Sequence, residues 1–286
     1  MAIKEFHDLA ELQLNINPLN AVVDSSWGNL GYWANSQGSD TYSQACTALA
    51  TKVGSMADLD AGHRVLDTGF GCGDQLLVWL EQFNIKKLAG INLSVSQTQY
   101  ANEKVNATNL SQDICCQLKT GDVCCDTAWQ GLDDKFDRII ALDCIYHFED
   151  KPSYFSQCEK HLKEDGALVV TDLLLNSPTL KVWYKLILKC ICYFSHIPFK
   201  NIKTIEAYQQ ELQALGLQLV KNEDIGAKVL LPFGHWLEGY ITQVKNSDAN
   251  TVKFNWMKYR GTARFLRWAH DNTVFSYHVL RIERLR

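Results

Sequence analysis

The most informative segment of the chain is Val65-Leu66-Asp67-Thr68-Gly69-Phe70-Gly71-Cys72-Gly73-Asp74, where an apolar strand runs into alternating glycines and a helical pattern follows. Glycines at such a turn let the backbone bend tightly and approach a ligand without a Cβ in the way. A dinucleotide-binding loop, Gly-x-Gly-x-x-Gly, would need Gly or Ala at position 74. The carboxylate of Asp74 would instead repel a pyrophosphate. The segment therefore predicts a ligand with a cationic or zwitterionic centre.

Strand-like and helix-like segments alternate on both sides of this loop. In chain order, the predicted strands and intervening helices are 64–67, 75–83, 87–91, 96–105, 113–119, 136–142, 153–162 and 167–174. Alternation at this spacing predicts an α/β fold, doubly wound, with a mostly parallel sheet and helices on both faces. Ligands of such sheets lie beyond the carboxyl ends of the strands.

The rest of the chain divides into regions around this core. We expect an N-terminal helical cap over 1–60, a cofactor-binding core over 61–176 and an inserted helical lid over 177–210. The region 211–286 should complete the sheet with strand-like segments at 217–221 and 275–282. Between them, a second helical insert is expected near 232–270, where aromatic and basic residues are frequent.

Five segments, in order, resemble class I S-adenosylmethionine-dependent methyltransferases. Asp67-Thr68-Gly69-Phe70-Gly71-Cys72-Gly73 is similar to motif I of that family. Two of the other four, 90–94 and 141–148, resemble its small-molecule branch, which includes tocopherol-type and sterol C-methyltransferases and macrolide-sugar O-methyltransferases. The four are Asn29-Leu30-Gly31-Tyr32-Trp33, Gly90-Ile91-Asn92-Leu93-Ser94, Thr120-Gly121-Asp122-Val123 and Ala141-Leu142-Asp143-Cys144-Ile145-Tyr146-His147-Phe148. The resemblance covers about residues 30–175. It implies a Rossmann-like methyltransferase fold with a seven-stranded sheet, and S-adenosylmethionine as cofactor.

The resemblance also implies which residues bind the cofactor. They are Tyr32, Trp33, Asp67, Gly69, Gly71, Gly73, Asn92, Leu93, Gln97, Asp122, Val123 and Asp143. Asp122 matches the acid that meets the adenine amino group, and a carboxylate is the acceptor that an exocyclic amine needs. Many members of the family hold the ribose hydroxyls with an acid after the second strand. This chain has Asn92 there, so Asn92, backbone groups and Gln97 become the candidates.

His147 is the candidate general base. It follows the fourth strand of the core, where ligands of such a sheet collect, and histidine has an ordinary pKa near neutrality. Methyl transfer from a sulfonium to a nucleophile requires positioning, exclusion of water and removal of a proton. The alternative is a histidine that only orients the substrate or packs under the lid.

The net charge of −4 conceals an uneven distribution along the chain. Residues 1–179 hold 12 basic and 24 acidic side chains, a net charge of −12, whereas residues 180–286 hold 16 and 8, a net charge of +8. The acidic part coincides with the predicted cofactor half and suits a cationic sulfonium. For the basic part, we expect contact with an anionic acceptor or an anionic membrane surface. Nucleic acid is a less favoured partner, because the Asn/Asp-Pro-Pro-Tyr/Phe motif of base methyltransferases is missing after the fourth strand.

The apolar stretch from Val182 to Phe199 is interrupted by charged residues, so it does not predict a spanning helix. Lys181, Lys185 and Lys189 recur every four residues and share one face of a predicted helix. This pattern describes a lid over an apolar pocket or a helix lying on a membrane surface. The alternative is an amphipathic helix packed on the core with a solvated lysine stripe.

Composition, the N-terminus and the cysteines indicate a folded protein and its cellular compartment. A content of 47% hydrophobic and 21% charged residues excludes a disordered chain. The N-terminus has no apolar signal region, and ten cysteines in a chain of this size favour free thiols over disulfides. The vicinal pairs Cys115-Cys116 and Cys124-Cys125 lack zinc-ligand spacing, so no metal is expected. These observations predict a cytoplasmic protein, peripheral on a membrane if the lysine-striped helix binds one, and leave the oligomeric state open.

The leading hypothesis is an enzyme that transfers a methyl group from S-adenosylmethionine to a small, lipophilic acceptor at O, C or N, in natural-product or lipid metabolism. One alternative is methylation of a phospholipid or phosphobase at a membrane surface. Another is a non-catalytic binding subunit that keeps the cofactor fold, although motif I and His147 are intact. A nicotinamide oxidoreductase is disfavoured by Asp74 and by the missing ribose acid.

Overall fold

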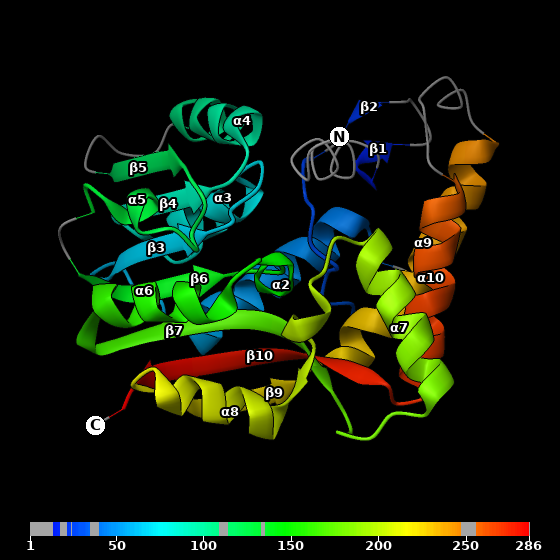
Figure 1. Cartoon of the computed structure of the whole chain (residues 1–286). Helices are drawn as coiled ribbons and strands as arrows, with labels where there is room; N and C mark the ends of the chain where they lie inside the picture. The colour runs from blue at the N-terminus through cyan, green and yellow to red at the C-terminus, as the bar shows by residue number, and fades with distance from the viewer. Residues whose placement is uncertain are drawn as a thin grey trace.

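The computed structural model describes residues 14–17, 22–23, 25–34, 40–108, 114–132, 135–246 and 256–285. Seven strands form one sheet in the order β5-β4-β3-β6-β7-β10-β9, and a two-residue strand, β8, pairs with β7 (Figure 1). The strands are β3 Arg64–Thr68, β4 Lys87–Asn92, β5 Cys115–Thr120, β6 Phe136–Ala141, β7 Leu162–Leu175, β8 Lys203–Thr204, β9 Leu217–Asp224 and β10 Phe275–Arg284. Only β10 runs antiparallel to its neighbours, β7 and β9. The predicted mostly parallel sheet of seven strands is confirmed, with β8 as a short addition.

Helices cover both faces of the sheet, as predicted. The helices are α2 Tyr42–Met56, α3 Asp74–Glu81, α4 Val95–Asn106, α5 Asp126–Trp129, α6 Lys151–His161, α7 Val182–Phe194, α8 Ile205–Ala214, α9 Gly226–Lys245 and α10 Trp256–Asp271, with 3-10 turns η1 Ile145–His147 and η2 Phe199–Asn201. Consecutive residues of β3 show the two layers: Val65 packs with α2 and α3, and Leu66 with α5, α6 and α8. Side chains of a strand alternate between faces, and both residues are fully buried because both faces of the sheet are covered.

The strand order reverses next to β3. From β3 the chain moves outward to β4 and β5, and then returns to the other side of β3 with β6 and β7. The connections that follow β3 and β6 therefore leave in opposite directions, to β4 and to β7, which opens a crevice at the carboxyl ends of β3, β4 and β6. Ligands of open α/β sheets bind at such a point.

The N-terminal region differs from the predicted helical cap over 1–60. Helix α2 lies where a helix was expected, and Thr41 begins it with a capping box to Gln44. Ahead of it, however, β1 Ile16–Asn17 and β2 Val22–Val23 form an antiparallel pair, and residues 25–34 contain neither helix nor strand. Part of the cap prediction, including residues 1–13, lies outside the described residues.

The two predicted inserts meet on one side of the sheet, where α7 lies beside α9 and α10 (Figure 1). Tyr184 of α7 packs edge-on against Trp268 of α10, with ring centroids 5.0 Å apart, and donates a 2.6 Å hydrogen bond to Asn272 Oδ1. The predicted lid range, 177–210, includes the first half of α8, which packs against the sheet through the buried Tyr208. Residues 247–255 of the second insert lie outside the description. Within the described chain, no helix combines the length and the apolar character needed to span a bilayer.

Candidate active site

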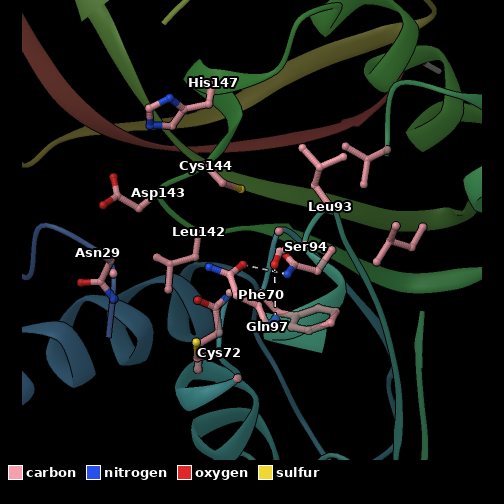
Figure 2. Close-up of a pocket in the computed structure, with 18 of the residues that line it drawn as sticks. Asn29, Phe70, Cys72, Leu93, Ser94, Gln97, Leu142, Asp143, Cys144 and His147 are labelled. Carbon is pink, nitrogen blue, oxygen red and sulfur yellow. Dashed lines mark hydrogen bonds between the residues drawn. The ribbon is translucent and has the colours of Figure 1, made fainter. Parts of the chain in front are cut away.

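A cavity opens at the carboxyl ends of the central strands, where the strand order reverses (Figure 2). Ten of the predicted site residues line it. They are Gly69, Gly71, Gly73, Asn92, Leu93, Gln97, Asp122, Val123, Asp143 and His147. These residues come from the end of β4 and from the segments that follow β3, β4, β5 and β6, so segments that are distant in sequence converge on one space.

The glycine loop requires its glycines for two reasons. Gly69, Gly71 and Gly73 have φ angles of 82°, 56° and 88°, in the left-handed region that side chains disfavour. In addition, a Cβ on Gly69 would lie 2.7 Å from the sulfur of Cys144, and one on Gly73 would lie 2.7 Å from Cβ of Ala101. The loop therefore forms a close-fitting cradle of bare backbone along the cavity.

Asp67 does not line the cavity. Its buried carboxylate accepts hydrogen bonds from Trp79 Nε1 (2.6 Å) and from Gln75 Nε2 (3.0 and 2.9 Å to its two oxygens). Burial raises the pKa of Asp67 to about 6, and these hydrogen bonds oppose the rise. Asp67 thus ties the end of β3 to α3 behind the glycine loop, which places the cradle without facing its ligand.

Asp74 lies at the start of α3 and lines the cavity. Its carboxylate pairs with Lys104 at 2.5 Å and accepts a long 3.4 Å hydrogen bond from the amide of Ser26. The first contact joins α3 to α4, and the second holds the segment 25–34 over the cavity. The aspartate that argues against a pyrophosphate therefore also helps to close the site.

Asn92 and Gln97 form the amide pair expected at the ribose. Asn92 Nδ2 donates to Gln97 Oε1 at 3.0 Å, and both side chains are buried where they line the cavity. Gln97 Nε2 is a buried donor that has no hydrogen-bond partner within the described chain. Such a donor costs about 1–3 kcal/mol unless a ligand satisfies it. A ribose hydroxyl oxygen is a suitable acceptor, so the residues present fit S-adenosylmethionine.

Replacing Gln97 by methionine is expected to weaken cofactor binding about tenfold, because the apolar side chain keeps the length but removes the donor. Calorimetric titration with S-adenosylmethionine measures the change. Gln99→Met is the matched control, since Gln99 is exposed on the same helix. Equal affinities of the two variants would contradict a cofactor contact at Gln97.

Asp143 connects the core to the segment above the cavity. It has a left-handed φ of 56°, and its half-buried carboxylate accepts from the Leu30 amide at 2.7 Å, from the Tyr146 hydroxyl at 2.8 Å and from the Tyr277 hydroxyl. Burial raises the pKa of Asp143 to about 6, and the three donors oppose the rise. Asp143 thus organises this end of the cavity as well as lining it.

The predicted residues Tyr32 and Trp33 do not line the cavity. Trp33 is fully buried and packs against Trp236 of α9, with ring centroids 5.6 Å apart, while Tyr32 is half-buried. Trp27 and Asn29, a few residues earlier, line it instead. The segment 29–33 was therefore correctly predicted to lie at the cavity, but the residues that line the cavity lie nearer the N-terminus than the predicted ones.

His147 ends η1 and lines the cavity. Its Nδ1 lies 3.2 Å from the carbonyl oxygen of His196. A carbonyl oxygen can only accept, so Nδ1 carries the proton in the neutral ring and Nε2 carries the lone pair. The side chain amide of Asn201 donates to the carbonyls of Tyr146 (3.0 Å) and Phe148 (2.7 Å), on either side of the histidine. The lid insert thus fixes both the backbone and the tautomer of His147.

Sequence reasoning missed several residues of the lining. They include Trp27, Asn29, Phe70, Cys144, Tyr146, Phe148 and Glu149. Most of them are neighbours of predicted residues within the same five segments, so the order of the segments was a sufficient signal for the loops. It did not indicate which side chains of each loop face inward.

Comparison with known proteins identifies the chain. The sequence model of the mycolic acid cyclopropane synthetase family matches residues 31–273, which is most of this chain. The chain belongs to this family. It is an enzyme, a class I methyltransferase that uses S-adenosylmethionine and acts on small molecules, so the predicted family, cofactor and enzyme class are confirmed.

Individual relatives are distant. The erythromycin 3''-O-methyltransferase of Saccharopolyspora erythraea is 27% identical over 80% of this chain and 72% of its own length. Phosphoethanolamine N-methyltransferase 3 of Arabidopsis thaliana is 30% identical over 59% of this chain, but the match spans only 31% of that protein. The solved structure of the cyclopropane synthase MmaA2 from Mycobacterium tuberculosis aligns with a TM-score of 0.73 at 16% identity, over 95% of this chain and 92% of that one. It therefore supports the fold alone.

Proposed function

We propose that this member of the mycolic acid cyclopropane synthetase family methylates a hydroxyl group of a small, uncharged, lipophilic acceptor, with His147 as general base. The observation that carries the proposal is the hydrogen bond from His147 Nδ1 to the His196 carbonyl, because it leaves the lone pair on Nε2. A neutral histidine in that tautomer, on the wall of the cavity, is equipped to accept a hydroxyl proton. The macrolide O-methyltransferase relative supports a hydroxyl acceptor.

The protein's own contribution is to hold the reactants and move one proton. S-adenosylmethionine supplies an activated methyl group on a sulfonium when it is bound. The glycine loop and Gln97 would hold that molecule, Asp143 holds the covering segment in place, and Nε2 of His147 receives the proton of the acceptor hydroxyl. Positioning and exclusion of water provide most of the acceleration expected for such a transfer.

The charge of the cavity favours an uncharged acceptor. Its lining contains four carboxylate residues, Asp74, Asp122, Asp143 and Glu149. The part of the lining that the structure describes contains no lysine and no arginine. The described lining therefore offers a phosphate group no lysine or arginine to pair with, and burying such a charge unpaired is costly. This argues against methylation of a phosphobase and against an anionic acceptor, although the basic part of the chain had suggested one.

The proposal includes the compartment. All ten cysteines are free thiols, which is the usual state in a reducing environment. We therefore place the enzyme in the cytoplasm.

An acceptor screen with methyl-labelled S-adenosylmethionine tests the reaction. Hydroxylated macrolides, polyketides and other lipophilic alcohols would be compared with phosphoethanolamine and unsaturated fatty acyl compounds. The expected product carries a new methoxy group, which NMR distinguishes from an N-methyl, a C-methyl or a cyclopropane. Turnover of phosphoethanolamine in preference to every alcohol would overturn the proposal, and so would a cyclopropane product.

A further inference from the structure

Helix α7 has apolar side chains on two opposite faces. One face packs inward, with Leu188 and Cys192 buried and Tyr184, Ile187 and Ile191 half-buried. The other points to solvent and is also apolar, which is unusual for a helix on a protein surface. Its exposed fractions are 79% at Val182, 51% at Trp183, 58% at Leu186, 78% at Tyr193 and 71% at Phe194. We call these five residues the α7 outer face.

The pattern differs from a packed helix with a solvated lysine stripe. At 100° per residue, Lys181, Lys185 and Lys189 lie along one edge of the helix, between the inward face and the α7 outer face. All three are exposed. The side of the helix farthest from the core is therefore occupied by aliphatic and aromatic groups, and the lysines flank it.

The segment of the chain that contains α7 carries charge of one sign. From 173 to 205 the chain contains five lysines and no acidic residue. The exposed lysines of α7 would therefore be attracted to an anionic surface. An apolar face with tryptophan and tyrosine, bordered by lysines, is the composition of helices that lie in a membrane interface.

The C-terminal end of α7 adjoins the active site. His196, just beyond the helix, accepts the hydrogen bond from His147. A second hollow at this end is lined by Tyr193, Phe194 and His196 together with Glu149, and Glu149 also lines the main cavity. The α7 outer face and the mouth of the active site are thus neighbours through these residues.

We propose that the α7 outer face docks on an anionic membrane, with the aromatic side chains in the interface and Lys181, Lys185 and Lys189 against the lipid headgroups. Docking would place the mouth of the cavity at the lipid surface, so that a lipophilic acceptor passes from the bilayer to His147. The delivery of an acceptor rests on the proposed function, whereas the docking itself does not.

Flotation of the full chain with vesicles tests the docking. Binding to vesicles of phosphatidylglycerol and phosphatidylcholine should be at least about tenfold tighter than to phosphatidylcholine alone, and should weaken at high salt. The charge reversal Lys181→Glu, Lys185→Glu, Lys189→Glu should lower binding to anionic vesicles about tenfold or more. The matched control, Lys87→Glu, Lys160→Glu, Lys221→Glu, reverses three exposed lysines on other elements and should bind like the wild type.

Brominated lipids test the contact at one residue. They should quench tryptophan fluorescence of the wild type in anionic vesicles, and the quenched fraction should fall in Trp183→Phe. Failure of the wild type to bind anionic vesicles would overturn the proposal, and so would equal loss in both triple variants. Self-association of the chain without vesicles, abolished by Leu186→Ser with Tyr193→Ser, would assign the face to a second copy instead.

Cofactor titration separates this proposal from the proposed function. The α7 triple variant should bind S-adenosylmethionine like the wild type, because these lysines do not line the cavity. Vesicle binding without methylation of any alcohol would leave the docking intact and refute the proposed reaction. Methylation of a dissolved alcohol without vesicle binding would refute the docking and leave the proposed reaction intact.

Discussion

Replacing His147 by alanine should lower kcat by at least about a hundredfold while leaving the affinity for S-adenosylmethionine unchanged. The imidazole of His147 lies at the cavity wall, and its hydrogen bond to the His196 carbonyl sets its tautomer. Loss of this ring removes the group that accepts the hydroxyl proton. Turnover with the identified alcohol and calorimetry with the cofactor measure the two quantities. The kcat–pH profile of the variant should also lose the limb on which the wild type gains activity as a base deprotonates.

His147→Asn separates a base from a positioning residue. The asparagine amide can still donate to the His196 carbonyl, as Nδ1 does, but it offers no nitrogen lone pair that can take a proton at neutral pH. If His147 is the base, asparagine should be nearly as inactive as alanine. Activity within about threefold of the wild type would show that the side chain only positions the loop.

Replacing Lys151 by methionine should destabilise the fold by about 3–5 kcal/mol, because it leaves the carboxylate of Asp172 buried without its partner. Both side chains are fully inaccessible to solvent, and Lys151 Nζ lies 2.5 Å from Asp172 Oδ2 and 3.2 Å from the Asn201 carbonyl. Urea unfolding measures the loss. Lys160→Met, at an exposed position on the same helix, is the control and should change stability by less than about 0.5 kcal/mol.

The pH dependence of this variant has a definite sign. Burial raises the pKa of Asp172 above its usual 3.8, and Lys151 opposes the rise. Without Lys151 the folded state holds the proton of Asp172 more tightly than the folded wild type does, so the stability deficit should grow as pH rises above the already raised pKa of Asp172 in the wild type. The double variant Lys151→Met, Asp172→Leu should recover most of the loss, since no buried charge remains. A single variant as stable as the wild type at neutral pH would contradict the assignment of an ion pair.

The candidate site shows how far sequence patterns reach. The five motif segments predicted the loops that line the cavity, and the observed strand order is the reason, since it brings the loops after β3, β4, β5 and β6 to one edge. Asp67 was predicted to bind the cofactor, although the alternation of side chains along β3 indicates that it faces α3. It lies two residues after Val65, so it faces α3 as Val65 does, and Gln75 and Trp79 of that helix bind it.

The structure also changes the meaning of the charge distribution. The cavity is lined only by residues between Ser26 and Glu149, so the basic part of the chain contributes nothing to its described lining. Three lysines of the lid segment, Lys181, Lys185 and Lys189, lie instead exposed along one edge of α7. The split between an acidic and a basic part was visible in the sequence, but which surface each part forms depends on packing.

The sequence alone determined the α/β class, because that class depends on local patterns of apolar strands and glycines at a turn. The resemblance of five segments to class I methyltransferases added the enzyme class and the loops of the site. Only the tertiary structure decided which side chains enter the cavity, the tautomer of His147 and the outward direction of the apolar face on α7. Each of these depends on contacts between residues distant in the chain, such as His147 with His196 and Tyr184 with Trp268. The sequence pattern of α7 shows two apolar faces, but it does not show which of them packs against the rest of the protein.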